Sequence, residues 1–410
     1  MAARPVDYLL IGGGVAAAAC AETLRAEGAD GSIVVVGREE DPPYERPVLS
    51  KGYLAGSSDR ADALWKPVSW WDEQDVELLA RKSVMKIDAD ERVAKLPGGD
   101  ELSFSKVLLA TGANVRRLRV EGTDNDGIHY LRAFGNADAI RADASAADRV
   151  VVVGGSWLGC EVAATMAALG HQVSLVMLES VCCENHLGPE VGGFVHHLLA
   201  ERGVDIHPRS EVARFEGSSE GRVERVVLSD DSAVDAGCVV IGAGVVPDVL
   251  LARSAGLDVG KTGGFACSSS LETSLPGVYA AGDAAEYDSP LHGRPARVEH
   301  FEVAVEHGRT AARAMLGRGV VHEVVPYFWS DLSDWATLEY VGIEAGSPVV
   351  RGSIDDGDFT AVYVDDDGRV VGAATAGRSD DLEAAKKLIV ERATPGRAAL
   401  ADEGTDLGAL

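Results

Sequence analysis

The sequence predicts an α/β fold with two parallel sheets flanked by helices, followed by a smaller C-terminal α+β region. Apolar β-branched runs alternate with helical patterns from residue 6 to about residue 320, which is typical of parallel sheets. Two short apolar strands, about 140 residues apart, also each end in a glycine-rich turn that opens a helix of small residues. Such turns are typical of Rossmann-like dinucleotide-binding domains, so we predict two of these domains in the chain.

The first glycine-rich turn lies in residues 8–17, which read YLLIGGGVAA and precede a helical pattern over residues 18–25. Backbone N–H groups at a helix N-terminus point toward an anion, and the helix dipole favours a pyrophosphate there. Gly12, Gly13 and Gly14 let the backbone approach that group, whereas at Ala17 only close helix packing is needed. Further strands are predicted over residues 33–36 and 106–110, the latter ending in Ala110-Thr111-Gly112.

The second turn lies in residues 150–159, VVVVGGSWLG, and precedes a helical pattern over residues 160–169. A strand over residues 173–178 is followed by Glu179, and later strands end in Gly242-Ala243-Gly244 and in Gly282-Asp283. Two such cradles in one chain predict two dinucleotides held face to face. Transfer of a hydride from one dinucleotide to the other requires at least this arrangement.

Beyond about residue 320 the pattern changes to that of antiparallel strands. We predict strands over residues 347–353, 359–364 and 370–375, because turns rich in aspartate and glycine separate them. A helix is predicted over residues 381–392, followed by a tail rich in glycine, alanine and aspartate. This region is the predicted C-terminal α+β domain.

Composition limits what the protein can bind. The 410 residues are 46% hydrophobic and 25% charged, which is ordinary for a soluble globular protein of two or three domains. No apolar run reaches the roughly 18 residues that a membrane span requires, and we interpret the apolar N-terminus as a strand rather than a targeting segment. The formal net charge of −27 repels polyanions, so we predict neither nucleic-acid nor membrane binding.

The cysteines and histidines do not have the spacing of a metal site. None of the six cysteines forms a C-x-x-C pair, so neither a zinc site nor a dithiol redox centre is predicted; they are Cys20, Cys160, Cys182, Cys183, Cys238 and Cys267. The pairs His196 with His197 and His300 with His307 match no known zinc or iron spacing. We therefore predict no metal and a reducing, cytoplasmic location.

Residues 43–51, PYERPVLSK, resemble the P-Y-x-R-P-x-L-S-K signature of the redoxin reductases. These are FAD-dependent NADH:ferredoxin and rubredoxin reductases, related to the apoptosis-inducing-factor flavoproteins. The resemblance covers nearly the whole chain and includes Gly159-Cys160-Glu161, Gly282-Asp283, Val298-Glu299-His300-Phe301 and Phe328-Trp329-Ser330-Asp331. It implies an FAD domain over residues 1–111 and 240–320, an NAD domain over residues 112–239 and a C-terminal domain over residues 321–410.

The resemblance also implies an FAD site. The acidic residue that holds the adenine ribose is expected at position 38, where this chain has Arg38, so we predict Glu39 as its substitute; an exposed loop charge is the alternative interpretation of Glu39. Asp283 is expected to accept a hydrogen bond from a ribityl hydroxyl. The remaining FAD-side and shared cofactor-binding residues are Ala16, Ala17, Arg46, Ala110, Thr111, Gly112, Gly242, Ala243, Gly244, Gly282, Glu299, His300, Phe301 and Trp329. Trp329 could instead be a core residue of the third domain.

Lys51 and Glu161 form the predicted catalytic pair. In relatives, the equivalents of these two residues form an ion pair, which would fix the lysine near the reactive edge of the flavin. A desolvated cation there could stabilise negative charge that accumulates on the reduced ring.

The predicted NAD site comprises the second cradle, namely Gly154, Gly155, Ser156, Trp157, Leu158 and Gly159, together with Glu179. Ser156 replaces the second glycine of the motif, a position where a small serine can be accommodated. Glu179 is placed to bind the 2′-hydroxyl of the ribose and to repel a 2′-phosphate. Because no arginine or lysine occurs between Gln172 and Glu201, we predict NADH rather than NADPH as the reductant.

The leading functional hypothesis is electron transfer from NADH through FAD to a small iron–sulfur redoxin, ferredoxin or rubredoxin, that feeds an oxygenase such as a cytochrome P450. The alternatives are an NADH oxidase or quinone reductase, and a redox-sensing NADH-binding flavoprotein with slow turnover. Redoxins are usually acidic, so a local basic patch is expected; the candidates are Arg294, Arg297, Arg309, Arg313 and Arg318. The protein is predicted to be a monomer or a homodimer.

Overall fold

The computed structural model describes residues 3–343 and 346–410, which divide into two compact units. Unit 1 comprises Met1–Glu45, Ala61–Asn114 and Val245–Pro326; unit 2 comprises Arg46–Arg60, Val115–Gly244 and Tyr327–Leu410. Unit 1 thus collects most of the two segments predicted for the FAD domain; residues 46–60, which contain Lys51, and residues 240–244 lie in unit 2 instead. Unit 2 collects the predicted NAD and C-terminal segments, and the three-domain boundaries themselves stay a prediction.

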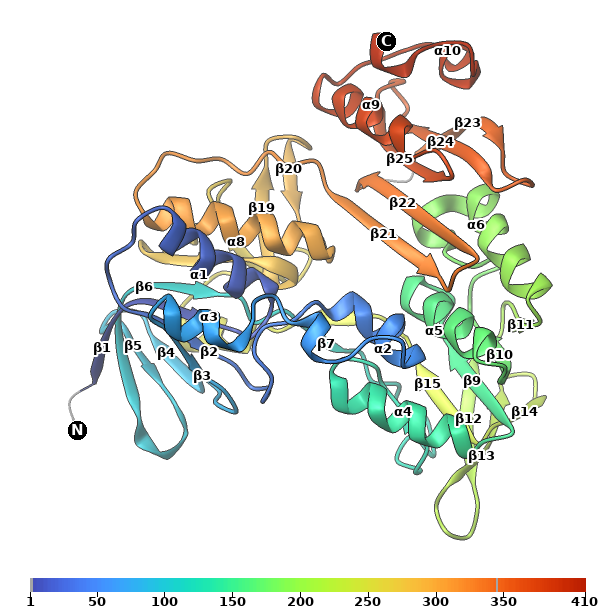
Figure 1. The fold of residues 1–410 in the computed structure, drawn as a ribbon, viewed down its shortest axis with the longest axis horizontal. Helices are drawn as coiled ribbons and strands as arrows, with labels where there is room; N and C mark the ends of the chain where they lie inside the picture. The colour runs from blue at the N-terminus through green and yellow to red at the C-terminus, as the bar shows by residue number, and fades with distance from the viewer. Residues whose placement is uncertain (1–2, 344–345) are drawn as a thin grey trace. The chain divides into compact units, whose positions relative to one another are not determined.

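Unit 1 is built around a seven-stranded sheet in which β1 pairs in parallel with β2 on one side and β6 on the other (Figure 1). The parallel pairs β2–β3 and β6–β18 extend it, whereas β4 and β5 join in antiparallel orientation. The predicted apolar runs become its central strands. The bounds are β1 (Arg4–Ile11), β2 (Ile33–Val36), β3 (Val76–Leu79), β4 (Lys86–Asp88), β5 (Val93–Lys95), β6 (Glu101–Leu109) and β18 (Val278–Ala280).

Two helices of unit 1, α1 (Val15–Ala26) and α8 (Phe301–Met315), lie side by side (Figure 1). Their close approach requires small residues: a Cβ on Gly308 of α8 would lie 2.2 Å from the carbonyl oxygen of Ala16. The prediction that the first helix starts at Ala18 is wrong, because the helix begins at Val15, directly after the turn. The other elements are α3 (Val68–Glu73), α7 (Leu250–Ala255), β16 (Val245–Pro247), β17 (Phe265–Cys267), β19 (Ala285–Ser289) and β20 (Arg294–Ala296), while β7 (Ala113–Val115) lies at the sequence boundary of the units.

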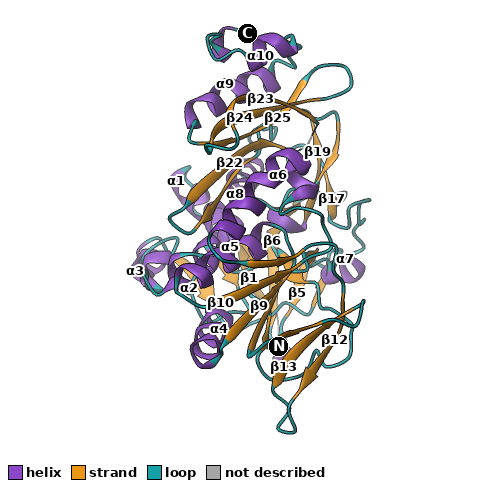
Figure 2. Cartoon of the chain, turned by 90° about the vertical axis from the view of Figure 1, so that its right-hand side faces the viewer, coloured by secondary structure: helices purple, strands orange, loops and turns teal. Residues whose placement is uncertain are grey.

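Unit 2 contains a five-stranded parallel sheet in the order β11-β10-β9-β15-β8. Figure 2 shows two of its central strands, β9 and β10. The prediction that the second strand extends to Leu178 is wrong: β10 ends at Val176, and Leu178 is 67% exposed. The strand bounds are β8 (Ile128–His129), β9 (Arg149–Val153), β10 (Gln172–Val176), β11 (Asp205–His207) and β15 (Cys238–Ile241). The helices are α2 (Gly52–Ala55), α4 (Phe134–Ala146), α5 (Trp157–Ala168) and α6 (Glu184–Glu201).

A small antiparallel sheet covers part of this parallel sheet. It consists of β12 (Val212–Gly217), β13 (Val223–Leu228) and β14 (Ala233–Asp235). Phe215 and Val226 from this sheet pack with Val151 of β9 and Ile241 of β15 in one buried apolar cluster. The cluster therefore holds β9, the strand that leads into the second glycine turn, in a fixed place.

The C-terminal part of unit 2 is a five-stranded antiparallel sheet with helices α9 (Ser379–Val390) and α10 (Arg397–Ala401). The three strands predicted from the aspartate turns are confirmed, as is the following helix, although that helix begins and ends two residues earlier than predicted. Two preceding strands complete the sheet in the order β21-β22-β25-β24-β23. The bounds are β21 (Tyr327–Leu332), β22 (Ala336–Gly342), β23 (Ser347–Ser353), β24 (Asp358–Val364) and β25 (Val370–Ala376).

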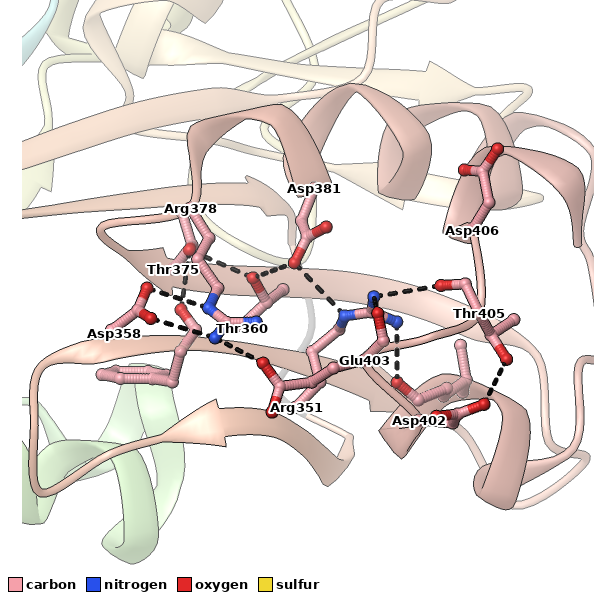
Figure 3. A network of polar contacts seen from close by, with 12 residues as sticks. Arg351, Asp358, Thr360, Thr375, Arg378, Asp381, Asp402, Glu403, Thr405 and Asp406 are labelled. Atoms are coloured by element: carbon pink, nitrogen blue, oxygen red, sulfur yellow. Dashed lines mark hydrogen bonds and ion pairs between the residues drawn. The ribbon is translucent and has the colours of Figure 1, made fainter.

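A network of polar contacts fastens the C-terminal tail to this sheet (Figure 3). Arg351, 5% exposed, pairs with Asp381 at 3.4 Å and donates to the carbonyl oxygens of Leu400 and Thr405 at 3.3 and 3.0 Å. Arg378 joins Asp358 of β24 to Glu403 of the tail. Burying an arginine is costly unless its charge and donors find partners. Carbonyl oxygens accept from both terminal nitrogens of Arg351, whereas its Nε only faces the Asp381 carboxylate and makes no hydrogen bond within the described residues.

Candidate functional site

The first glycine turn of unit 1 has the geometry of an anion cradle. Gly12 has φ +130°, and a Cβ there would lie 1.9 Å from the carbonyl oxygen of Ala110. Gly14 is the N-cap of α1, and a Cβ on it would meet no protein atom within 4 Å. The turn therefore offers the N-terminus of α1 and open space beside it, which fits a pyrophosphate.

Arg38 and Glu39, at the end of β2, have defined partners. Arg38 reaches Asp248 at 3.2 Å and the side-chain oxygen of Asn114 at 3.4 Å. The carboxylate of Glu39 accepts a hydrogen bond from the hydroxyl of Tyr44 at 2.7 Å. Glu39 is half-buried and bonded to the fully buried Tyr44, which does not match the alternative of an exposed loop charge. Its contact with a ribose stays a prediction.

The structure brings the predicted turn at Gly282 and Asp283 next to the first cradle. Gly282 has φ +69°, and a Cβ there would lie 3.5 Å from the Cβ of Ala16. Its neighbour Ala281 donates its N–H to the carbonyl oxygen of Leu109, at the end of β6. The sequence separates these segments widely, but the sheet places both at the carboxyl ends of its parallel strands, where ligands of open α/β sheets bind.

The predicted Glu299-His300-Phe301 segment forms the N-terminus of α8, with His300 as the N-cap. The ring of Phe301 lies 6.4 Å from that of Trp65, and the carboxylate of Glu299 pairs with Arg297. Arg297 also donates to the carbonyl oxygen of Asp283 at 3.2 Å. Arg297, predicted only as part of a docking patch, therefore braces the Asp283 turn instead. The nearby hydroxyl of Thr111 donates to the carbonyl oxygen of Asp248 at 2.6 Å.

Lys51 and Glu161 form an ion pair within unit 2, with Lys51 Nζ 2.6 Å from Glu161 Oε1. The same carboxylate accepts hydrogen bonds from Ser50 at 2.5 Å and from Ser330 of β21 at 2.7 Å. Glu161 is 7% exposed, and the side chain of Lys51 is 16% exposed. A carboxylate with three donors in so dry a place is fixed in position and keeps the lysine charge in place.

Two of these donors, Ser50 and Ser330, were not predicted as site residues. Both lie inside motifs that the sequence analysis quoted, Leu49-Ser50-Lys51 and Trp329-Ser330-Asp331. Ser330 points toward Glu161, whereas the indole of Trp329 donates to Asp331 at 3.1 Å and stacks on Tyr327 at 6.3 Å. Trp329 is only half-buried, which is not the environment of the core residue that the alternative interpretation proposed.

Arg46 begins the short 3₁₀ segment that precedes Lys51. Its guanidinium donates to the carbonyl oxygen of Arg132 within unit 2. The carbonyl contact holds this end of the Pro-Val-Leu-Ser-Lys segment, while the hydroxyl of Thr165 in α5 holds the other end by donating to the carbonyl oxygen of Ser50 at 2.7 Å. The cofactor-binding role of Arg46 stays a prediction.

The second glycine turn, in unit 2, repeats the geometry of the first. Gly154 has φ +117°, and a Cβ there would lie 2.4 Å from the carbonyl oxygen of Gly242. Ser156 is the N-cap of α5 with extended backbone angles, φ −87° and ψ −177°. A Cβ on Gly159 would lie 1.9 Å from the carbonyl oxygen of Gly154. Gly242, the first residue of the predicted Gly242-Ala243-Gly244 turn, therefore lies directly against this cradle.

His186 is a residue of this cradle that the sequence analysis did not single out. Its Nε2 lies 3.2 Å from the hydroxyl of Ser156, and its ring lies 6.0 Å from that of Trp157. Trp157 also packs edge-on against Phe328 of β21 at 4.8 Å. No sequence signal links His186 to the turn, because α6 brings it there from 30 residues away.

Glu179 follows β10 as predicted, and Asn185 donates to its carboxylate at 3.0 Å. The loop after β11 passes beside it: the backbone N–H of Arg209 donates to the backbone carbonyl oxygen of Glu179 at 3.0 Å. The prediction of NADH rather than NADPH considered only the segment between Gln172 and Glu201. Arg209 lies outside that segment, because the neighbouring parallel strand β11 leads to it.

Three of the six buried cysteines gather behind the second cradle. The Sγ atoms of Cys160 and Cys183 lie 3.9 Å apart, and the N–H of Cys183 donates to the carbonyl oxygen of Gly155 at 2.7 Å. Contact with Cys160 and burial raise the pKa of the Cys182 thiol, so it stays protonated. Protonated, buried thiols are poor nucleophiles, and these cysteines pack rather than react.

Within residues 3–343 and 346–410, no group of three or more histidine, cysteine, aspartate or glutamate side chains could hold a metal ion. Over the same residues, no helix is both long and apolar enough to cross a bilayer. The arginines predicted as a docking patch have acidic neighbours: Arg309 pairs with Glu306, while Arg313 and Arg318 both pair with Glu27 at 2.8 Å. These pairs reduce the positive field that the patch can present.

Residues 6–308 match the family described as pyridine nucleotide-disulphide oxidoreductase, and residues 327–410 match the reductase C-terminal family. The first match covers well over half of the chain. The chain belongs to the pyridine nucleotide-disulphide oxidoreductase family. Membership confirms the predicted family, the Rossmann-type α/β fold with its C-terminal domain, and FAD and NAD(H) as the cofactors.

Similar proteins align over the full length. The chain is 35% identical to the ferredoxin–NAD(+) reductase component of the anthranilate 1,2-dioxygenase system of Burkholderia cepacia, with 98% of both chains covered. It is 33% identical to the putidaredoxin reductase of Pseudomonas putida, over 98% of this chain and 96% of that protein. Among solved structures, the covalent putidaredoxin reductase–putidaredoxin complex matches with a TM-score of 0.93 at 32% identity, covering 98% of this chain and 97% of the other.

Proposed function

We propose that this protein is a cytoplasmic NADH-dependent flavoprotein reductase that passes electrons through FAD to a small iron–sulfur redoxin, which in turn supplies an oxygenase. The observation that carries the proposal is the ion pair between Lys51 and the buried Glu161, which lies on α5, the helix of the second cradle. The similar ferredoxin reductases of dioxygenase and cytochrome P450 systems support the choice of acceptor.

Both cradles fit the cofactors. Gly12 and Gly154 lie where a side chain would strike a carbonyl oxygen, and each turn leads into a helix whose N-terminus is not capped by a side chain. An anion is the natural partner of such an uncapped N-terminus. We assign the first cradle with Asp283 and Glu39 to FAD, and the second cradle with Glu179 to NADH.

FAD, when bound, can accept two electrons as a hydride from NADH and give them up one at a time to a one-electron acceptor. The protein's own part is electrostatic. Lys51 keeps a positive charge in a place with little water, where it acts more strongly than on the surface. Glu161 fixes the ammonium group, while Ser50 and Ser330 hold the carboxylate. We propose Lys51 as the flavin-side cation that stabilises negative charge on the reduced ring.

We also propose that NADH is preferred to NADPH. Glu179 would accept a hydrogen bond from the 2′-hydroxyl and repel a 2′-phosphate. Arg209, held beside Glu179 by its backbone, is the residue that would weaken this preference. The preference is therefore expected to be clear but moderate.

The test is an anaerobic stopped-flow experiment with the yellow holoprotein in two mixing steps. In the first step NADH is added and the flavin absorbance followed; in the second the reduced protein meets a [2Fe–2S] ferredoxin, a rubredoxin, a quinone or oxygen. We expect rapid bleaching, then reoxidation by a redoxin at least about tenfold faster than by oxygen or quinone. The Lys51→Met variant should bleach about 100-fold more slowly. Lys95→Met, which breaks the exposed pair with Glu101, is the matched control and should bleach normally.

Other outcomes would overturn the proposal in distinct ways. Fast reoxidation only by quinone or oxygen would identify an oxidase or quinone reductase. Slow reoxidation by every acceptor, with a change in oligomeric state on adding NADH, would identify a redox sensor.

A further inference from the structure

Two histidines lie fully buried in unit 1, and none of the roles assigned above uses them. His307 of α8 is 0% exposed and His322 is 1% exposed. Their rings meet edge-on at 4.5 Å, and the ring of Tyr287 of β19 covers both, at 4.8 and 5.2 Å. Buried imidazoles without a charged partner are uncommon, so the pair calls for a physical explanation.

The hydrogen bonds fix the tautomer of His307. The N–H of Gly282 donates to His307 Nδ1 at 3.2 Å, so that the ring proton must sit on Nε2. The hydroxyl of Thr310 lies 3.2 Å from Nδ1 of the His322 ring. The backbone N–H of His322 donates to the carbonyl oxygen of Ser269 at 2.8 Å. Among the described residues, Nε2 of His307 and Nε2 of His322 have no hydrogen-bond partner.

An unpartnered buried nitrogen costs free energy that an apolar side chain at the same place would not cost. Within the part of the chain that the structure describes, the His307 ring makes one hydrogen bond, which it accepts from the N–H of Gly282 in the Gly282–Asp283 turn. The next residue of α8, Gly308, touches the first cradle, since a Cβ there would meet the carbonyl oxygen of Ala16. Consecutive residues of α8 therefore contact the two parts of the FAD site of unit 1.

We propose that His307 is a positioning residue that couples FAD retention to its own neutral state. The neutral ring accepts the N–H of Gly282 and keeps the turn that presents Asp283 in place. A protonated ring cannot accept, and would set an N–H against an N–H. Uptake of a proton by His307 then opens the turn and loosens FAD. This inference rests on the proposed role of Asp283 in holding FAD.

The surroundings favour the neutral ring. Burial, with a smaller contribution from His322, lowers the pKa of His307 well below its usual value. Burial lowers the pKa of His322 to about 4. Tyr287 also faces the pair, and burial raises its pKa, so it stays neutral. Burial also raises the pKa of the Cys267 thiol of β17, which interacts electrostatically with Tyr287. None of these three groups stabilises an imidazolium.

The direction of the pH effect follows from this environment. When the turn opens, His307 regains an ordinary pKa of about 6.5, so binding FAD must expel a proton below that pH. Retention is therefore complete above pH 6.5 and declines as the pH falls. For one proton, the dissociation constant of FAD rises by at most about tenfold per pH unit.

The experiment measures FAD dissociation by the fluorescence of released flavin between pH 5.5 and 8, with circular dichroism to verify the fold. His307→Leu removes the acceptor and should raise the dissociation constant about tenfold at pH 7.5. His307→Gln offers an amide oxygen to Gly282, and should bind within about twofold of the wild type while losing its pH dependence. His322→Leu, which leaves the bond to Gly282 intact, is the matched control and should bind FAD normally at pH 7.5.

A wild-type acid dependence that persists in His307→Gln would overturn the inference, as would normal FAD binding by His307→Leu. Asp283→Ala separates this inference from the role on which it rests. Loss of FAD by Asp283→Ala together with normal binding by His307→Leu contradicts only the inference. Normal binding by both variants contradicts the role of Asp283 as well.

Discussion

The turn after β1 and the turn after β9 can be compared residue by residue. At the first glycine they agree: Gly12 and Gly154 have φ of +130° and +117°, and each would strike a carbonyl oxygen if it carried a side chain. At the third position they differ in residue but not in backbone, since Gly14 and Ser156 are both extended with φ of −98° and −87°. At the first position a side chain would clash with the protein backbone, so glycine is required there. At the third position the protein leaves room for a side chain, so only a bound ligand could require glycine.

At the last position of the motif, the second cradle requires glycine and the first does not. Ala17 is fully buried in α1, whereas a Cβ on Gly159 would lie 1.9 Å from the carbonyl oxygen of Gly154. Helix α5 thus packs closer to its own turn than α1 does. A single consensus motif hides this difference, because only the first cradle has room for a side chain at the last position.

The largest effect is expected from the first glycines. Gly12→Ala should yield protein without FAD, because the turn cannot give way to a Cβ at 1.9 Å from a backbone oxygen and the positive φ adds strain. Gly154→Ala should keep FAD but slow flavin reduction by NADH about 100-fold or more. Flavin content after gel filtration and stopped-flow reduction measure the two outcomes.

Gly14→Ala is the control for this pair, because its Cβ meets no protein atom within 4 Å. Its free energy of unfolding should stay within about 1 kcal/mol of the wild type. Full FAD content in Gly12→Ala would contradict the assignment of the first cradle.

A second effect concerns the helices. Counted from the first glycine, Glu161 of α5 occupies the position of Ala19 in α1, so only the second cradle carries a buried charge there. Glu161→Ala removes the carboxylate that holds Lys51, Ser50 and Ser330, and should slow flavin reduction about 100-fold. Glu161→Gln keeps an oxygen for these donors and should lose only about tenfold. Equal rates in both variants and the wild type would show that the pair is merely structural.

A third, smaller effect concerns the charge after the second strand, where the cradles also differ. Arg38 pairs with Asp248 in unit 1, whereas the carboxylate of Glu179 accepts a hydrogen bond from the neutral amide of Asn185. Glu179→Gln should lower the ratio of kcat/KM for NADH over NADPH by about tenfold, since the repulsion of a 2′-phosphate is lost. Arg209→Glu should raise the same ratio. Comparable kcat/KM values for both cofactors in the wild type would contradict the preference.

Much of this arrangement is predictable from local pattern. The strands β1, β2 and β9 are apolar runs that end at glycines, and the Lys51–Glu161 contact follows from the family resemblance. The contacts that sequence reasoning missed join segments far apart. Ser330 reaches Glu161 from 169 residues away, and His307 reaches Gly282 through the packing of α8. A serine or histidine carries no periodic signal, so only the tertiary fold shows which group it meets.

The smallest effect, and the sharpest test of the comparison, is expected when the third positions are exchanged. Ser156→Gly makes the second cradle match the first, and Gly14→Ser makes the first match the second. Because the backbone is extended in both, and Ser156 makes no capping bond, each exchange should change the free energy of unfolding by less than about 0.5 kcal/mol. The dissociation constant of NADH, titrated with the reduced flavoprotein, should change less than about threefold in Ser156→Gly, although the contact with His186 is lost. A gain of about 30-fold or more would mean instead that Ser156 holds the pyrophosphate away from α5, and that backbone geometry alone does not define this cradle.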